Sequence, residues 1–162
     1  MVRLRLVLLS CLVLLAAALL SGALAVVSVA SSSMRPTVCE GDRLLMWTVQ
    51  AGSLAGRGDL VVLRAPDGAR LLKRLVAESG QSVEVVDGRL VVDGRPQAES
   101  FVDLESVDGT SFGPVTVGMG RVFVLGDDRE NSIDSRDFGD VPRSRVVGLV
   151  LAPVGGTCPA AP

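Results

Sequence analysis

A serine-rich segment and a single lysine are the residues of this chain whose types suit nucleophilic chemistry. Residues 31–37 read SSSMRPT, and Lys73 is the only lysine among 16 basic residues. Serine is a weak nucleophile that needs a neighbouring base, and lysine is that base in one variant of the catalytic triad. The chain contains no histidine, which excludes Ser-His-Asp and Cys-His mechanisms. The residue types therefore predict serine chemistry with an amine base, provided that the two groups meet.

The surroundings of Lys73 favour an amine that can lose its proton. Residues 70–77 read RLLKRLVA, and we expect them to form a strand. Alternation along a strand would place Leu71, Lys73, Leu75 and Ala77 on one face, and Leu72, Arg74 and Val76 on the other. Arginine stays protonated in proteins, whereas burial can lower the pKa of a lysine enough for base catalysis. The alternative is a structural lysine at a strand end, whose amine extends into solvent.

Length, charge and cysteine content limit the classes of function. A chain of 162 residues is the size of one domain, and its net charge of −2 includes no basic block. We therefore expect no nucleic-acid partner. We also expect no metal site, because a zinc site would need the three cysteines together with carboxylates. Cys39 and Cys158 could pair in an oxidising compartment or remain separate thiols, and the sequence leaves both possibilities open.

The N-terminus indicates a membrane segment. Residues 6–30 carry no charge and follow Arg3 and Arg5, and as a helix they would exceed the bilayer core of about 30 Å. We interpret residues 1–30 as a cytoplasmic stub with one transmembrane helix, and residues 31–162 as an extracytoplasmic domain. The alternative is a cleavable signal peptide, with Ala23-Leu24-Ala25 as its cleavage site. The anchor is favoured because the apolar run continues through Val29 beyond that site.

Apolar runs of strand length recur between turn signals in the rest of the chain. We expect strands at residues 43–49, 59–64, 70–77, 83–86, 89–92, 121–125 and 146–151. Asp87-Gly88 favours a type I′ hairpin between two of them. We expect loops at 51–58 and 126–142, and an irregular region at 96–120 with a possible short strand at 115–117. Because no segment beyond the N-terminus has helical periodicity, we predict a mainly β fold: an antiparallel, barrel-like domain on one transmembrane helix.

The second of the two expected loops, residues 126–142, contains a dense mixed-charge cluster. Its members are Asp127, Asp128, Arg129, Glu130, Asp134, Arg136 and Asp137. Such a cluster is either a solvated, turn-rich loop or the support of a functional site. The residue types alone do not separate these two readings.

Five motifs in sequence order resemble those of type I signal peptidases, which are serine peptidases with a Ser/Lys dyad. The motifs are Ser33-Met-x-Pro-Thr37, Gly41-Asp-Arg-Leu-Leu45, Arg57-Gly-Asp-Leu-Val-Val62, Lys73-Arg74 and the charged stretch Gly126–Arg136. Each motif alone is a weak signal, but five in the right order are a strong one. Together they span most of the chain beyond the N-terminal apolar run.

The resemblance implies a division of catalytic roles. Ser33 would be the nucleophile and Lys73 the general base. The backbone N–H of Ser33 and the hydroxyl of Ser31 would form the oxyanion hole.

The resemblance also implies supporting residues in the charged loop. Ser132 aligns with a serine that hydrogen-bonds the lysine and orients it. Asp134 and Arg136 align with an ion pair that braces the loop. Asp128 stands where the family usually has asparagine, and Glu130 where it usually has aspartate.

The expected activity is that of a membrane-bound serine endopeptidase that cleaves N-terminal signal peptides from exported preproteins. The family prefers small residues at positions −1 and −3, and an extended substrate beside Met34, Val38 and Leu72 would present alternate side chains to shallow apolar pockets. The partners would be preproteins and the lipid bilayer, and the location the outer face of the cytoplasmic membrane. No metal or organic cofactor is implied.

Two alternatives remain open from the sequence. One is a dedicated peptidase of the same superfamily that matures a single precursor. The other is a non-catalytic, membrane-tethered β domain that binds a partner. The second alternative predicts that Lys73 is exposed to solvent and far from Ser33.

Overall fold

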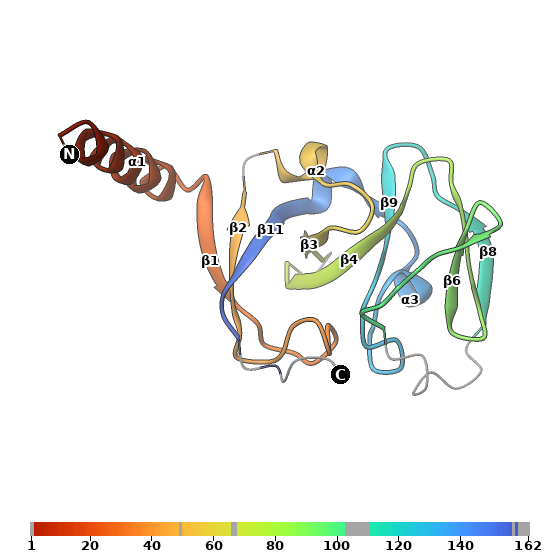
Figure 1. Cartoon of the computed structure of the whole chain (residues 1–162). Helices are drawn as coiled ribbons and strands as arrows, with labels where there is room; N and C mark the ends of the chain where they lie inside the picture. Colours follow the sequence, from red (N-terminus) through yellow and green to blue (C-terminus); the bar gives the residue numbers. More distant parts are fainter. Residues whose placement is uncertain (1, 49, 66–67, 103–110, 157, 159–162) are drawn as a thin grey trace.

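The structure, a computed structural model, describes residues 2–48, 50–65, 68–102, 111–156 and 158. These residues form an N-terminal helix and two antiparallel sheets (Figure 1). The expected mainly antiparallel β fold is confirmed, with the larger sheet curled rather than closed. Residue 49 at the end of the first expected strand, and residues 103–110 of the expected irregular region, lie outside the described residues.

The N-terminal apolar run is divided between a helix and a strand. Helix α1 (Val2–Leu20) projects away from the sheets, and strand β1 (Leu24–Ser28) follows it (Figure 1). The expectation of one helix over residues 6–30 is therefore wrong beyond residue 20. Gly22 breaks the helix with a φ of 71°, and the valine-rich sequence after it favours a strand. Within the described residues, no helix combines the length and the apolar character that a membrane crossing requires.

The larger sheet has seven strands and carries most of the domain. In spatial order they are β1, β2 (Arg43–Trp47), β11 (Val146–Gly155), β3 (Leu60–Arg64), β4 (Arg70–Glu78), β9 (Arg121–Leu125) and β10 (Val141–Pro142). Each neighbouring pair is antiparallel. The strands expected near residues 43, 59, 70, 121 and 146 are thus confirmed, with β11 longer than predicted.

The smaller sheet has four strands and lies at the end of the molecule opposite α1 (Figure 1). Its order is β7 (Arg95–Pro96), β6 (Arg89–Val92), β5 (Ser82–Val86) and β8 (Phe112–Thr116). Asp87 and Gly88 connect β5 to β6 with φ angles of 48° and 75°. Two positive φ angles are the signature of the type I′ turn that this dipeptide predicts.

The structure has three short helical turns, two of them inside expected loops and the third directly after the expected loop 126–142. They are α2 (Ala51–Leu54), α3 (Ser135–Phe138) and the 3-10 turn η1 (Arg143–Arg145). Four residues make about one helical turn, which is too short to give a periodic apolar pattern in the sequence. Asp134 begins α3 with a capping box that includes the side chain of Asp137.

Strand β4 lies at the centre of the core and carries both Lys73 and Arg74. Leu75 is buried in one apolar cluster, with Leu71 packed against it, while Leu72 packs against another. The predicted alternation fails at Ala77, which packs in the same cluster as Val76. A register shift between Leu75 and Ala77 in the pairing with β9 accounts for this change of face.

Candidate active site

Ser33 lies in a tight turn that two apolar side chains anchor to the core. The segment leaves β1 and turns so that the N–H of Val38 donates to the carbonyl of Met34 at 2.9 Å. Met34 and Val38 are 1% and 4% exposed and belong to one apolar cluster. Their burial fixes the start of the turn, and Ser33 is held there at 8% exposure.

Lys73 reaches Ser33 from strand β4. Its Nζ lies 2.7 Å from Ser33 Oγ, within hydrogen-bonding distance. Lys73 is only 3% exposed. The structure therefore brings the two groups together, contrary to what the non-catalytic alternative predicts. In the neutral amine the same contact can run in the opposite direction, with the serine hydroxyl donating to the nitrogen lone pair.

The charge environment of Lys73 is set first by burial. Burial lowers the pKa of the ammonium group below its ordinary value of 10.5, and the nearby carboxylates of Asp134 and Asp127 oppose this shift. Arg136 acts in the same direction as burial. The net result is a lowered pKa, which favours the unprotonated amine that a general base needs.

Ser31 lies on the solvent-exposed side of Ser33. Its Oγ lies 3.3 Å from Ser33 Oγ, and its side chain is open to solvent. If Ser33 attacked a carbonyl carbon, a hydroxyl at this distance could reach the oxygen of that carbonyl group. The geometry is therefore compatible with the predicted oxyanion role, which remains a prediction.

The loop that follows β9 contacts the backbone of Ser33 directly. The N–H of Asp128 donates to the carbonyl of Ser33 at 3.2 Å. Gly126 lies where the loop begins, and a Cβ added there would approach Ser33 O to 2.6 Å and Ser132 Oγ to 2.2 Å. Only glycine therefore allows the loop to lie this close to Ser33.

Asp134 organises the far side of the same loop. Its fully buried carboxylate pairs with Arg136 at 2.9 Å and accepts the N–H of Gly126 at 2.9 Å. Arg136 also donates to the carbonyl of Arg129 at 2.7 Å. The predicted pair is thus close together and connects the two ends of the loop.

Ser132 does not form the hydrogen bond that its alignment implies. Its Oγ is buried, and among the described residues it has no hydrogen-bond partner. It lies against Gly126, close to Ser33 O. A buried hydroxyl without a partner beside Ser33 can hydrogen-bond a water or another polar group that enters the site.

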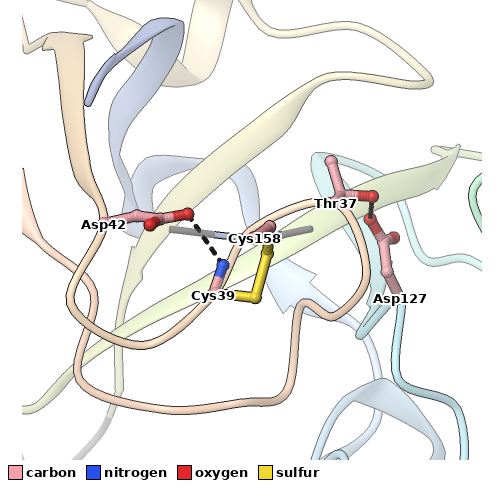
Figure 2. Close-up of a disulfide and its surroundings, with 5 residues drawn as sticks. All are labelled: Thr37, Cys39, Asp42, Asp127 and Cys158. Atoms are coloured by element: carbon pink, nitrogen blue, oxygen red, sulfur yellow. Dashed lines mark hydrogen bonds between the residues drawn. A yellow bond between two sulfur atoms is a disulfide. The ribbon is translucent and has the colours of Figure 1, made fainter. Parts of the chain in front are cut away.

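A second buried network lies beside Ser33 and Lys73, and its pairing is not predictable from the sequence. Arg74 donates to both carboxylate oxygens of Asp127, at 2.8 and 2.6 Å, and to the carbonyl of Gly58 at 2.7 Å. The hydroxyl of Thr37 donates to the same carboxylate at 2.6 Å (Figure 2). Asp127 therefore ties the end of the Ser33 turn to strand β4.

A disulfide holds the other side of the Ser33 turn. Cys39 is bonded to Cys158, which places Cys158 beside the turn (Figure 2). The N–H of Cys39 also donates to the carboxylate of Asp42 at 2.9 Å. Of the two possibilities that the sequence left open, the structure has the paired cysteines.

The residues expected to contact substrate lie in the apolar cluster under the Ser33 turn. Met34 and Val38 are buried, and Leu72 is half-buried beside them. Leu72 directly precedes Lys73, so this cluster adjoins the dyad. Substrate contact by these three residues remains a prediction.

Comparison with known proteins gives a consistent assignment. The family model described as "Signal peptidase, peptidase S26" matches residues 3–154. The probable thylakoidal processing peptidase 2 of Arabidopsis thaliana is 38% identical over 131 residues, which are 75% of this chain and 35% of that protein. Signal peptidase I T of Bacillus subtilis is 36% identical over 131 residues, which are 74% of this chain and 68% of the relative.

Further relatives agree with these. The probable signal peptidase I-1 of Synechocystis is 36% identical over 131 residues, which are 75% of this chain and 66% of the relative. The chain thus spans about a third of the plant relative's length and about two thirds of the bacterial ones. The crystal structure of a signal peptidase I from Enterococcus faecalis aligns with a TM-score of 0.54 at 30% identity, covering 60% of this chain and 97% of that one. This chain belongs to the signal peptidase family, peptidase S26.

Proposed function

We propose that this protein is a membrane-bound serine endopeptidase that removes N-terminal signal peptides from exported preproteins. The observation that carries the proposal is the buried contact of 2.7 Å between Lys73 Nζ and Ser33 Oγ. A lysine with a lowered pKa beside a serine hydroxyl is what amine-based activation of a nucleophile requires. Membership of the peptidase S26 family supports the same reaction class.

The first half of the reaction is acylation of the serine. The neutral amine of Lys73 takes the proton from Ser33 as Oγ attacks the scissile carbonyl carbon. The resulting oxyanion accepts hydrogen bonds from the Ser33 N–H and the Ser31 hydroxyl. When the tetrahedral intermediate collapses, the C–N bond breaks, and the Lys73 ammonium returns its proton to the leaving amine.

The second half is hydrolysis of the acyl-enzyme. Lys73, again neutral, takes a proton from a water molecule that attacks the ester carbonyl. Collapse of this second intermediate breaks the bond to Ser33 Oγ, which regains its proton from Lys73. The two products are the released signal peptide and the mature protein.

Strand β4 offers a place for an extended substrate next to the dyad. On one edge, β3 pairs with residues 70–74, whereas on the other edge β9 pairs only from Arg74 onward. Among the described residues, no strand pairs with residues 70–73 on the β9 side. A peptide that adds to this edge would lie beside Lys73 and use backbone hydrogen bonds that do not depend on its sequence.

Specificity would come from the apolar cluster next to this edge. In an extended peptide, alternate side chains point in the same direction, so positions −1 and −3 would face Met34, Val38 and Leu72 together. Because Met34 and Val38 are already buried, only shallow space remains above them. Small residues at −1 and −3 fit such a surface best.

Two features support a membrane location with the domain in an oxidising compartment. The described apolar side chains of α1 are exposed and do not pack against the domain, for example Leu8 at 61% and Leu12 at 64% exposed. An exposed apolar surface of this kind favours contact with a bilayer. The disulfide between Cys39 and Cys158 suits an extracytoplasmic domain. We therefore propose that helix α1 (Val2–Leu20) is the anchor and that the domain begins at β1, earlier than the expected boundary between residues 1–30 and 31–162.

The direct test is cleavage of a preprotein by the purified full chain in detergent. We expect Ser33→Ala and Lys73→Ala each to abolish cleavage, because each removes one member of the dyad. Far-UV circular dichroism would show whether the variants keep the β fold. Retained cleavage by either folded variant would contradict the dyad.

A second experiment separates general from dedicated processing. Several unrelated preproteins with small residues at −1 and −3 would be compared at equal concentration. General processing predicts that kcat/KM varies little among them, since recognition uses the peptide backbone and two small side chains. Cleavage of a single preprotein would instead identify a dedicated maturation peptidase.

A further inference from the structure

A short segment from the smaller-sheet side of the fold contacts both arginines next to the dyad. Residues 99–102, called the strap below, follow β7 and form a turn in which the N–H of Val102 donates to Glu99 O at 3.1 Å. Glu99 pairs with Arg129 of the loop after β9. The ring of Phe101 lies 3.8 Å from the guanidinium carbon of Arg74.

The pair between Glu99 and Arg129 is almost completely buried. The side chains are 5% and 1% exposed, and both guanidinium Nη atoms of Arg129 donate to the two carboxylate oxygens, one of them at 2.9 Å. A buried, bidentate arginine–carboxylate pair fixes orientation as well as charge. Removing one partner would leave the other charge buried and unpaired.

Arg129 connects the strap to the backbone that touches the nucleophile. Its Nε donates to the carbonyl of Gly126 at 3.0 Å. Two residues further along, the N–H of Asp128 donates to the carbonyl of Ser33 at 3.2 Å. The contacts therefore run without a break from Glu99 through Arg129 and residues 126–128 to Ser33.

We propose that Glu99 is a positioning residue for the Ser33 nucleophile. By holding Arg129, it fixes the backbone of residues 126–128 at the distance where Asp128 supports the Ser33 carbonyl. Glu99 does not touch the dyad itself, and its effect passes through Arg129. This inference rests on the proposed function, in which Ser33 attacks the substrate.

The proposal gives the smaller sheet a role in catalysis. The N–H of Gln97, two residues before the strap, donates to the carbonyl of Leu90 at 2.9 Å. This hydrogen bond connects the residues that lead into the strap to β6. The strap is thus held by the smaller sheet on one side and by two buried arginines on the other. Small displacements of catalytic groups have large effects on rate. A strap that holds residues 126–128 rigidly would therefore affect the rate through the position of Ser33.

The main test compares Glu99→Gln with Glu130→Gln in the full chain. The first variant keeps the shape of the side chain but removes the charge that Arg129 faces. We expect its kcat to fall about 10- to 100-fold, with KM changed less than about twofold, because the strap is not part of the proposed substrate edge. Glu130 is exposed in the same loop, and its substitution should leave kcat unchanged.

A double-mutant cycle with Arg129→Met tests the route of the effect. If Glu99 acts through Arg129, adding Glu99→Gln to Arg129→Met should lower kcat no further. A loss of kcat in the double variant that equals the product of the two single losses would overturn the proposal. An unchanged kcat in a folded Glu99→Gln variant would overturn it as well.

Two controls separate this inference from the stability of the fold and from the proposed function. If Glu99→Gln does not fold, Glu99→Asp decides, since it keeps the charge but shortens the reach. A reduced kcat in that variant supports positioning, and a wild-type kcat contradicts it. Ser33→Ala is assayed beside them: if it retains activity, the proposed function itself fails, whereas its inactivity with a fully active Glu99→Gln removes only the role of Glu99.

Discussion

Lys73 and Arg74 are neighbouring basic residues on strand β4, and their side chains have different kinds of partner. Both are buried, at 3% and 9% exposure. Arg74 is bonded to the carboxylate of Asp127 by two hydrogen bonds and lies against the ring of Phe101. The Nζ of Lys73 instead lies against the neutral hydroxyl of Ser33.

The contrast explains how burial can lower the pKa of Lys73 although two carboxylates lie near it. Asp127 is held by Arg74 and Asp134 is held by Arg136, each in a close ion pair. Each carboxylate is already paired with an arginine. Its attraction for the Lys73 ammonium therefore offsets the effect of burial on the pKa only in part. The arginines therefore hold fixed charge, which leaves the lysine free to exchange a proton.

The largest expected effect comes from making the two positions alike. Lys73→Arg should lower kcat by about 10²- to 10⁴-fold, the usual contribution of a general base, because a guanidinium does not lose its proton. Arg74→Lys keeps the positive charge beside Asp127 and should lower kcat far less. Initial rates of preprotein cleavage at saturating substrate would measure both. Comparable activity in Lys73→Arg and wild type would remove the distinction between the two cations.

The next largest effect concerns the stability of the paired cation. Asp127→Asn should lower the free energy of unfolding by about 3 kcal/mol, because it leaves the Arg74 guanidinium buried without a countercharge. Thr37→Val removes one hydrogen bond to the same carboxylate and should cost about 1 kcal/mol. Urea unfolding of the full chain in detergent would give both values. Equal, small losses would mean that the pair at Asp127 contributes little.

The sequence predicts the parts of this contrast that depend on residue types and local pattern, but not the parts that depend on tertiary packing. The lone lysine and the missing histidine are visible in the sequence and indicate serine chemistry with Lys73 as the base, while the resemblance of the ordered motifs to type I signal peptidases indicates Ser33. The strand that carries Lys73 also follows from local apolar pattern. The lysine and its strand need only residue types and spacing, whereas the choice of Ser33 among the three serines needs the family resemblance.

The partners of the arginines depend on tertiary packing and could not be predicted. Arg74 on β4 pairs with Asp127 of the loop after β9, and Arg129 pairs with Glu99 from a segment whose sequence has no strand or helix pattern. The cluster of charges in the loop offered several equally plausible pairings. The N-terminal error has a related cause, since valines after Gly22 fit an apolar helix and a paired strand equally well until β2 is placed beside them.

A smaller effect is expected from pH. Because the pKa of Lys73 is lowered on folding, cleavage should rise with pH as the amine loses its proton, with a midpoint below 10.5. Between the folded-state pKa and 10.5 the unfolded chain binds one more proton than the folded chain. The free energy of unfolding should therefore rise with pH in that window, by at most about 1.4 kcal/mol per pH unit.

Lys73→Met provides the reference for that measurement. Its side chain has similar length and no proton to lose, so its free energy of unfolding should lack this contribution to the pH dependence. Urea titrations of both proteins across the window would show the difference. A wild-type slope identical to that of Lys73→Met would indicate that the lysine stays protonated in the folded protein.

The smallest expected effect comes from an ion pair that is not buried. Arg121 and Asp140 approach to 2.7 Å, close to the 2.6 Å between Arg74 and Asp127, but their side chains are 39% and 26% exposed. Solvent already stabilises both charges there, so Asp140→Asn should change the free energy of unfolding by no more than about 1 kcal/mol. Urea unfolding beside Asp127→Asn makes the comparison at nearly equal ion-pair distance. A loss as large as that of Asp127→Asn would show that proximity, rather than burial, determines what an arginine pair contributes in this fold.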